Sequence, residues 1–139
     1  MILTKIYNQE EVDQTAQMLY GLLSTYKIIT FTGDLGAGKT TLVASLLKTC
    51  GVTEIVQSPT FSYVNIYTND KDQTFYHFDL YRISCLEDFC SLGFEEYLSM
   101  PNSWVFIEWP ALIMPLLTHN ACHAIIDYEG QNKRKITVV

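Results

Sequence analysis

Apolar residues near the start of the chain recur with a helical period. They are Val12, Ala16, Leu19 and Leu23. Residues three or four positions apart share one face of a helix, so this spacing predicts a first helix near residues 9–24. Asn8, followed three residues later by Glu11, has the form of a capping box, in which each side chain bonds the other residue's backbone N–H.

Several other segments have the pattern of strands. Residues 28–31 and 103–107 are apolar runs, as in strands that are buried on both faces of a parallel sheet. Residues alternate through 61–79 on either side of a polar turn, which predicts a β-hairpin. Residues 121–128 and 135–139 are predicted to be two closing strands joined by a turn.

Residues 33–40 read Gly-Asp-Leu-Gly-Ala-Gly-Lys-Thr, which matches the phosphate-binding loop pattern. Gly36 and Gly38 leave room for backbone N–H groups to converge on phosphate oxygens, in torsions that a side chain would resist. Lys39 adds a positive charge near the β- and γ-phosphates, and Thr40 offers a hydroxyl to Mg²⁺. One short segment therefore carries the chemistry of a nucleotide phosphate site.

The segments on both sides of this loop are those that a phosphate site requires. A strand is predicted before it, and apolar residues at helical spacing follow it up to Gly51, which is placed to end the helix. The N-terminus of that helix directs its unpaired N–H groups and its dipole at the anion. This order makes a chance glycine-rich turn with a surface lysine the weaker interpretation.

Composition narrows the classes of function. The 139 residues fit one domain, and a hydrophobic content of 48% is enough for a real core. The net charge of −6 argues against a surface that binds DNA or RNA by neutralising phosphates, but leaves room for action through a partner. The four cysteines include no Cys-x-x-Cys pair, which favours buried free thiols over a zinc site or a disulfide framework.

The sequence shows no targeting or membrane segment. The N-terminus lacks a basic region followed by an apolar run, and no apolar stretch approaches the roughly 18 residues that a spanning helix needs. We therefore expect a cytoplasmic protein with no membrane partner.

Two acidic residues end apolar strands and are candidates to hold a metal. Asp79 ends the second strand of the predicted hairpin, and Glu108 ends the strand at 103–107. The carboxyl ends of parallel strands form the ligand crevice of an open α/β sheet, where a carboxylate binds Mg²⁺ or its waters, or orients an attacking water. The pattern leaves open which of the two is the direct ligand, or whether one is only a solvated strand end.

Three further candidates each have an ordinary structural alternative. Thr60 is either a switch residue that closes on Mg²⁺ and the γ-phosphate, or a hydroxyl bonded to its own turn. For His77, packing within a strand is favoured over catalysis. Trp109, beside the second acidic candidate, either shapes the pocket or packs, and packing is the default.

Four motifs occur along the chain in a specific order. They are GDLGAGKTT at 33–41, SPTF at 58–61, HFDLYR at 77–82 and IEWP at 107–110. The phosphate loop alone is common, but the series resembles the bacterial TsaE family, the ATPase of tRNA threonylcarbamoyladenosine (t6A) biosynthesis. The resemblance runs from about residue 8 to the C-terminus.

This resemblance implies an α/β fold, a single P-loop NTPase domain over residues 1–139. Its three layers would hold a mostly parallel central sheet, flanking helices and a β-hairpin. The implied cofactors are ATP and Mg²⁺, and the implied protein partner is the TsaD–TsaB complex, through which alone the protein would act on tRNA. The ATPase would reset that complex between turnovers. Because the chain shows no obvious finger arginine, we expect weak ATP hydrolysis alone and faster hydrolysis with the partner.

The resemblance also assigns roles to residues of this chain. Those expected to hold the nucleotide are Gly33, Asp34, Gly36, Ala37, Gly38, Lys39, Thr40, Thr41, Trp109 and Arg134. Thr40 and Glu108 would hold Mg²⁺, with Asp79 as the second candidate ligand. Asp79 would also assist hydrolysis, and Thr60 would lie in a switch-like loop. Many members carry a Thr early in the first helix where this chain has Val12, so the nucleotide contact of that Thr is in doubt here.

Two other classes use the same loop. A small-molecule or nucleoside kinase usually carries an arginine-bearing lid over the phosphates, whereas the nine Lys and Arg residues of this chain are scattered. A guanine-nucleotide switch needs an Asn-Lys-x-Asp segment, and residues 69–72 have these residue types in the wrong order. The kinase is kept as the alternative function.

Overall fold

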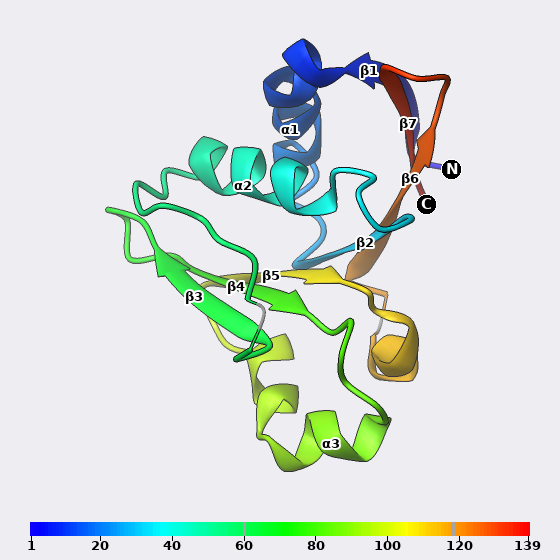
Figure 1. Ribbon diagram of the computed structural model, residues 1–139. Coiled ribbons are helices and arrows are strands. Elements are labelled where there is room, and N and C mark those ends of the chain that lie inside the picture. Colours follow the sequence, from blue (N-terminus) through cyan, green and yellow to red (C-terminus); the bar gives the residue numbers. More distant parts are fainter. Residues whose placement is uncertain (60, 118) are drawn as a thin grey trace.

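A computed structural model describes residues 1–59, 61–117 and 119–139. Its seven strands form one sheet in the order β1-β7-β6-β2-β5-β4-β3 (Figure 1). The strands are β1 (Leu3–Asn8), β2 (Ile28–Thr32), β3 (Val64–Thr68), β4 (Thr74–Asp79), β5 (Ser103–Glu108), β6 (Ala121–Tyr128) and β7 (Lys133–Val138). The helices are α1 (Val12–Tyr20), α2 (Lys39–Thr49) and α3 (Leu86–Ser91), with the 3-10 helices η1 (Gln9–Glu11), η2 (Phe94–Leu98) and η3 (Ala111–Leu116).

The centre of the sheet is parallel and its two sides are antiparallel. Strands β6, β2, β5 and β4 run in parallel, while β3–β4, β6–β7 and β1–β7 pair antiparallel. Short turns join β3 to β4 and β6 to β7, and such turns can only produce antiparallel pairs. The sheet is therefore mixed around a parallel core, and it contains the expected hairpin of β3 and β4.

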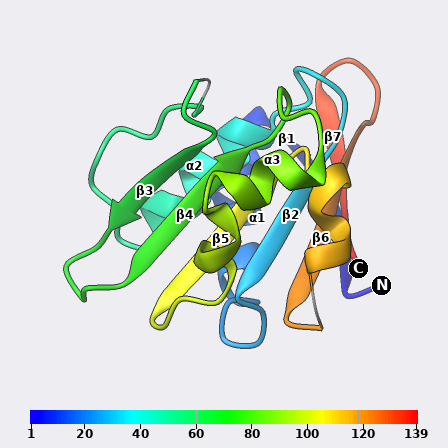
Figure 2. The same ribbon diagram turned by 90° about the horizontal axis from the view of Figure 1, so that it is seen from below.

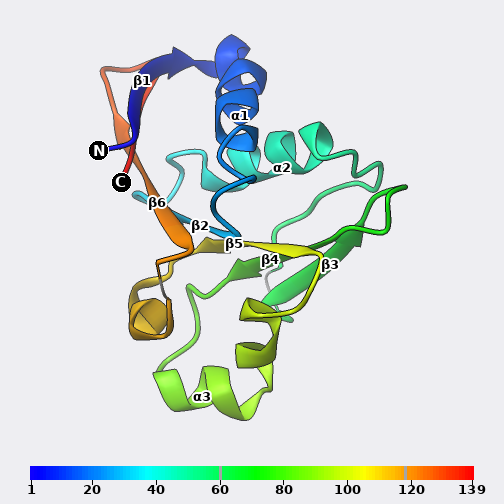
Figure 3. The ribbon, with the colours of Figure 1, turned by 180° about the vertical axis from the view of Figure 1, so that it is seen from behind.

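Helices cover both faces of this sheet. Figures 1 and 3 show α1 and α2 on one face, while Figure 2 shows α3 and η3 on the other. Side chains of β5 alternate between the two: Phe106 packs with the α1–α2 core, and Val105 and Ile107 with the opposite one. Glu108 lies two residues after Phe106, so the strand period brings it to the α2 face.

The ends of the helices follow their sequence signals. Asn8 and Glu11 form the predicted capping box, with N···O distances of 3.0 and 3.1 Å. The first helix is shorter than expected, because α1 ends at Tyr20 and the chain continues in turns. Gly51, at φ +92°, closes α2 as predicted. Its N–H donates to the carbonyl of Lys48, and the N–H of Val52 donates to the carbonyl of Leu47. Within the described residues, no helix has the length and apolar character needed to cross a membrane.

Candidate functional site

The phosphate loop joins the end of β2 to the start of α2, and three glycines make its path possible. Gly36 and Gly38 have φ of +82° and +100°, a region that other residues rarely adopt. Gly33 is required for space, because a Cβ there would lie 2.6 Å from the carbonyl oxygen of Ile126. The loop is thus fitted against β6 and directs its backbone to the start of α2.

Lys39 is folded back onto this loop. The residue is 5% exposed, and Nζ donates to the carbonyls of Gly33 at 2.6 Å and Asp34 at 2.9 Å. Nζ also lies 4.1 Å from the centre of the Trp109 ring. Burial lowers the pKa of Lys39, and the nearby carboxylates, Glu108 foremost, act in the opposite direction. The lysine is held at the loop by groups that phosphate oxygens can replace.

Thr40, Glu108 and His77 form a hydrogen-bonded cluster where α2 begins and where β4 and β5 end. The Thr40 hydroxyl lies 2.9 Å from each Glu108 carboxylate oxygen, and His77 Nε2 lies 2.6 Å from Oε2. Glu108 is 2% exposed and His77 is fully buried. A hydroxyl and a carboxylate are the hard oxygen donors that Mg²⁺ prefers.

This donor set fits a Mg²⁺ ion in a phosphate loop, which takes few protein ligands and completes its shell with phosphate oxygens and water. In the described part of the chain, no group of three or more His, Cys, Asp or Glu is arranged to hold a metal. These residues therefore offer the ion one hydroxyl and one carboxylate at the start of α2, rather than a cage made of protein ligands alone.

Asp79 lies beside this cluster but makes other contacts. It is the register neighbour of Glu108 across β4 and β5. Its carboxylate accepts hydrogen bonds from Ser58 Oγ at 3.1 Å and from the Tyr81 backbone N–H at 3.0 Å. The two acidic residues that the sequence leaves as alternatives are therefore held differently, since it is Glu108 that accepts from the Thr40 hydroxyl. Thr60 lies outside the described residues, so its switch role stays a prediction.

Trp109 and Arg134 both contact the loop. Trp109 adopts φ +57°, unusual for a bulky residue, and its ring packs against Tyr81 at 4.7 Å between centroids. Arg134 Nε donates to the carbonyl of Ala37 at 3.1 Å, and its guanidinium lies 4.2 Å from the centre of the Tyr128 ring. Trp109 also flanks Lys39, and its role toward the nucleotide stays a prediction.

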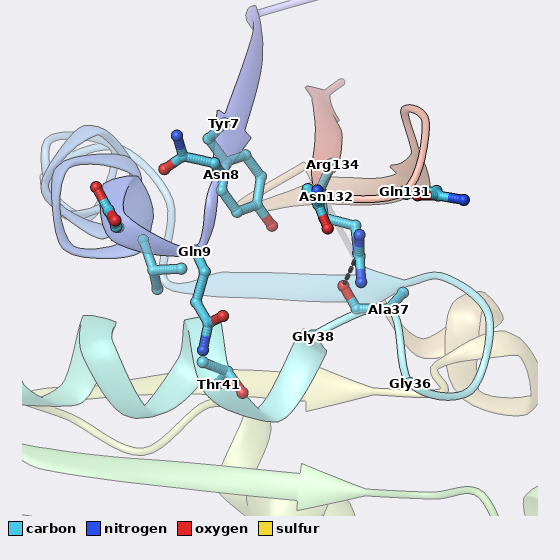
Figure 4. A pocket seen from close by; sticks show the side chains of 12 residues that line it. Tyr7, Asn8, Gln9, Gly36, Ala37, Gly38, Thr41, Gln131, Asn132 and Arg134 are labelled. Carbon is cyan, nitrogen blue, oxygen red and sulfur yellow. Dashed lines mark hydrogen bonds between the residues drawn. The ribbon is translucent and has the colours of Figure 1, made fainter.

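A cleft of about 820 Å³ opens beside the loop. Figure 4 shows Arg134 reaching the loop at Ala37, while the Gln9 side chain points toward Thr41 of α2. The lining residues that sequence reasoning missed are Tyr7, Asn8, Gln9, Glu10, Gln131 and Asn132. None of them belongs to a nucleotide-binding motif in the sequence. The pairing of β1 with β7 brings these two ends of the chain together. The volume suits a base and sugar next to the phosphate site.

Thr41 and Val12 also line this cleft. Most of the predicted site residues therefore gather in two adjoining regions. Thr40 and Glu108 lie in the hydrogen-bonded cluster, with Lys39 bonded to the loop beside it, and Gly36, Gly38 and Thr41 line the cleft. Asp34 takes part through its backbone carbonyl, which accepts from the lysine.

Comparison with known proteins connects this geometry to one family. The family described as "Threonylcarbamoyl adenosine biosynthesis protein TsaE" matches residues 6–136. A protein of Rickettsia felis named tRNA threonylcarbamoyladenosine biosynthesis protein TsaE is 35% identical over 133 residues, covering 95% of this chain and 76% of the relative. The Bacillus subtilis protein of the same name is 34% identical over 130 residues, with 94% and 80% covered.

A solved structure shows the same architecture. The crystal structure of Bacillus subtilis YdiB superposes with a TM-score of 0.74 at 29% identity, covering 99% of this chain and 86% of that one. The expected P-loop NTPase fold, with a parallel sheet centre, flanking helices and a hairpin, is confirmed.

Proposed function

This chain belongs to the TsaE family of threonylcarbamoyl adenosine biosynthesis proteins, and we propose that it binds and hydrolyses ATP with Mg²⁺ in the t6A modification of tRNA. The t6A role comes from the relatives, whose names carry it. The ATPase role comes from the site. In this proposal the protein works in the cytoplasm.

The observation that carries the ATPase role is the contact between Thr40 and Glu108 at the start of α2. Their oxygens are 2.9 Å apart, beside a lysine already held at the loop. Thr40 and Glu108 would hold Mg²⁺, which when bound neutralises charge on the β- and γ-phosphates. Lys39 would exchange its two loop carbonyls for phosphate oxygens.

Asp79 has a separate role in this proposal. Its carboxylate lies beside Glu108 but is bonded to Ser58 and Tyr81 rather than to Thr40. A carboxylate in this place is suited to orient the attacking water. Trp109 and Arg134 would flank the phosphates and support the loop, as their contacts with Lys39 and Ala37 suggest.

The arrangement of the arginines supports slow hydrolysis without a partner. The chain has two, Arg82 and Arg134. Arg82 packs over the Phe61 ring at 5.7 Å, and Arg134 is tied to Ala37. Within the described residues, neither arginine contacts Thr40 or Glu108, where an arginine would stabilise charge in the transition state. We propose that the TsaD–TsaB complex is the protein partner, accelerates hydrolysis and links this protein to tRNA.

The test is size-exclusion chromatography of the protein with its own TsaD–TsaB pair, with and without ATP and Mg²⁺. We expect co-elution that depends on nucleotide and is lost in Lys39→Ala, together with faster ATP hydrolysis in the mixture. Lys48→Ala, which changes an exposed lysine at the far end of α2, is the matched control. Failure to co-elute under every nucleotide condition, or equal hydrolysis rates with and without the pair, would contradict the partner assignment. Phosphate transfer to a small acceptor would instead favour the kinase.

A further inference from the structure

His77 has a place in the fold that packing alone does not require. It lies in β4 between Asn65 of β3 and Phe106 of β5, and none of its surface is exposed. Its neighbours on the same face include the aromatic core residues Phe75 and Phe106. An apolar side chain could fill this position with a smaller desolvation penalty, because a buried polar ring needs hydrogen-bond partners.

The two ring nitrogens of His77 are not equivalent. Nε2 lies 2.6 Å from Glu108 Oε2, whereas Nδ1 has no hydrogen-bond partner among the residues that the structure describes. A buried N–H without an acceptor is costly, so the ring proton belongs on Nε2. The His77 side chain therefore donates to the carboxylate, and this charge-assisted bond is its one polar contact in the described structure.

This bond gives the two Glu108 oxygens different hydrogen-bond partners. His77 holds Oε2 from within the sheet, while the Thr40 hydroxyl reaches both oxygens from the start of α2. If Mg²⁺ binds here, the Thr40 oxygen would coordinate the ion through a lone pair, while its single O–H can donate to only one of the two carboxylate oxygens. The His77 bond does not involve Oε1, because Nε2 approaches Oε2 from the buried strand β4.

We propose that His77 is a positioning residue that fixes the Glu108 carboxylate in the orientation that binds Mg²⁺. The proposal rests on the proposed function, since it takes Glu108 as a ligand of the ion. Partners that orient a metal ligand from behind usually contribute about 10-fold to 100-fold in metal affinity or activity. His77 then affects the nucleotide site only through the metal and not through the phosphates.

The experiment compares variants that keep or lose the donor. In His77→Gln the new side-chain amide nitrogen reaches nearly as far as Nε2 does, whereas His77→Leu keeps bulk without a donor. His123→Leu is the control, because His123 is also hydrogen-bonded inside the sheet but to Thr30, at 2.7 Å, rather than to Thr40 or Glu108. For each protein, calorimetry gives the affinity for ADP in saturating Mg²⁺ and in EDTA, and a melting curve without nucleotide reports folding.

The Mg²⁺ gain is the ratio of ADP affinity in saturating Mg²⁺ to ADP affinity in EDTA. We expect this ratio to be about 10-fold smaller in His77→Leu than in the wild type, while the affinity in EDTA stays within about 2-fold of the wild type. His77→Gln and His123→Leu should keep the gain. If His77→Leu does not fold, His77→Asn, whose amide is too short to reach Oε2, takes its place against His77→Gln.

Two results would overturn the proposal, and only the second would also contradict the metal role of Glu108. If the wild type gains affinity from Mg²⁺ and the donor-less variants gain as much, His77 is only structural and the proposed function stands. If Mg²⁺ does not raise the ADP affinity of the wild type, Glu108 is not a ligand of the ion, and the positioning role of His77 is contradicted as well.

Discussion

The phosphate end of the site and the wall of the adjoining cleft are made in different ways. At the phosphate end, Lys39, Glu108 and His77 are buried and bonded to one another or to the loop backbone. At the cleft wall, Gln9 and Gln131 are exposed side chains near the two ends of the chain. A buried, bonded group leaves an unpaired partner when it is removed, while an exposed one is replaced by water.

This contrast predicts a gradient of mutational effects. Substitutions at the phosphate end, Asp79 beside the cluster included, should cost most, those at the junction between loop and wall less, and those in the wall least. Each region also has its own readout: metal dependence and hydrolysis at the phosphate end, nucleotide affinity alone at the wall.

The largest effect is expected from the two acidic residues, measured as ATP hydrolysis in the presence of TsaD–TsaB. Asp79→Asn should lower the rate by about 1,000-fold while ADP still binds more tightly with Mg²⁺ than in EDTA, because a water-orienting base is lost and the metal ligand is kept. Glu108→Gln should lower the rate similarly and also abolish the effect of Mg²⁺ on binding. The reverse pattern would make Asp79 the direct ligand.

Lys39→Ala should weaken ADP binding by about 100-fold, since it removes a charge-assisted contact to the phosphates that is worth about 3 kcal/mol. Calorimetry measures the loss, with Lys48→Ala as the control on the same helix. A loss of less than about 3-fold would mean that the backbone of the loop alone holds the phosphates, and the contrast between the two regions would weaken.

Arg134 joins the two regions, because it lines the cleft and bonds the loop carbonyl of Ala37. We expect Arg134→Ala to lower ADP affinity by about 10-fold, through a loop that is less well held, with an equal loss in Mg²⁺ and in EDTA. Lys133→Ala, which changes its exposed neighbour on β7, should leave binding as in the wild type. A loss that appears only with Mg²⁺ would instead assign Arg134 to the metal end.

The phosphate end of the site can be predicted from the sequence, whereas the cleft wall cannot. The phosphate loop, its strand and its helix are contiguous, so their geometry follows from local rules on glycine, apolar period and helix end. Glu108 and Asp79 can be found from the sequence because strand ends in a parallel sheet converge at one edge. Distinguishing them requires the Thr40 distance, since both have the same pattern along the chain.

The cleft wall cannot be predicted in this way. Tyr7 and Arg134 lie opposite each other in the register of β1 and β7, a pairing of segments at opposite ends of the chain. No local period encodes such a contact. The sequence favours a packed strand histidine at His77, and its burial agrees with that. Its bond to Glu108, however, depends on the β4–β5 register and is invisible in the chain order.

The smallest effect is expected at Val12, which lines the cleft wall at the position where the family resemblance leads us to expect a Thr. Val12→Thr is nearly isosteric and adds a hydroxyl at the cleft, so we expect ADP affinity to rise by about 3-fold, the worth of one modest hydrogen bond at a partly exposed site. Val12→Ala separates the two properties of that side chain: it removes apolar contact without adding a donor and should bind ADP slightly more weakly than the wild type. Both changes in affinity should be the same in Mg²⁺ and in EDTA, because the wall does not touch the metal. If Val12→Thr weakens binding, the wall of this protein holds the nucleotide by apolar contact rather than through a hydroxyl.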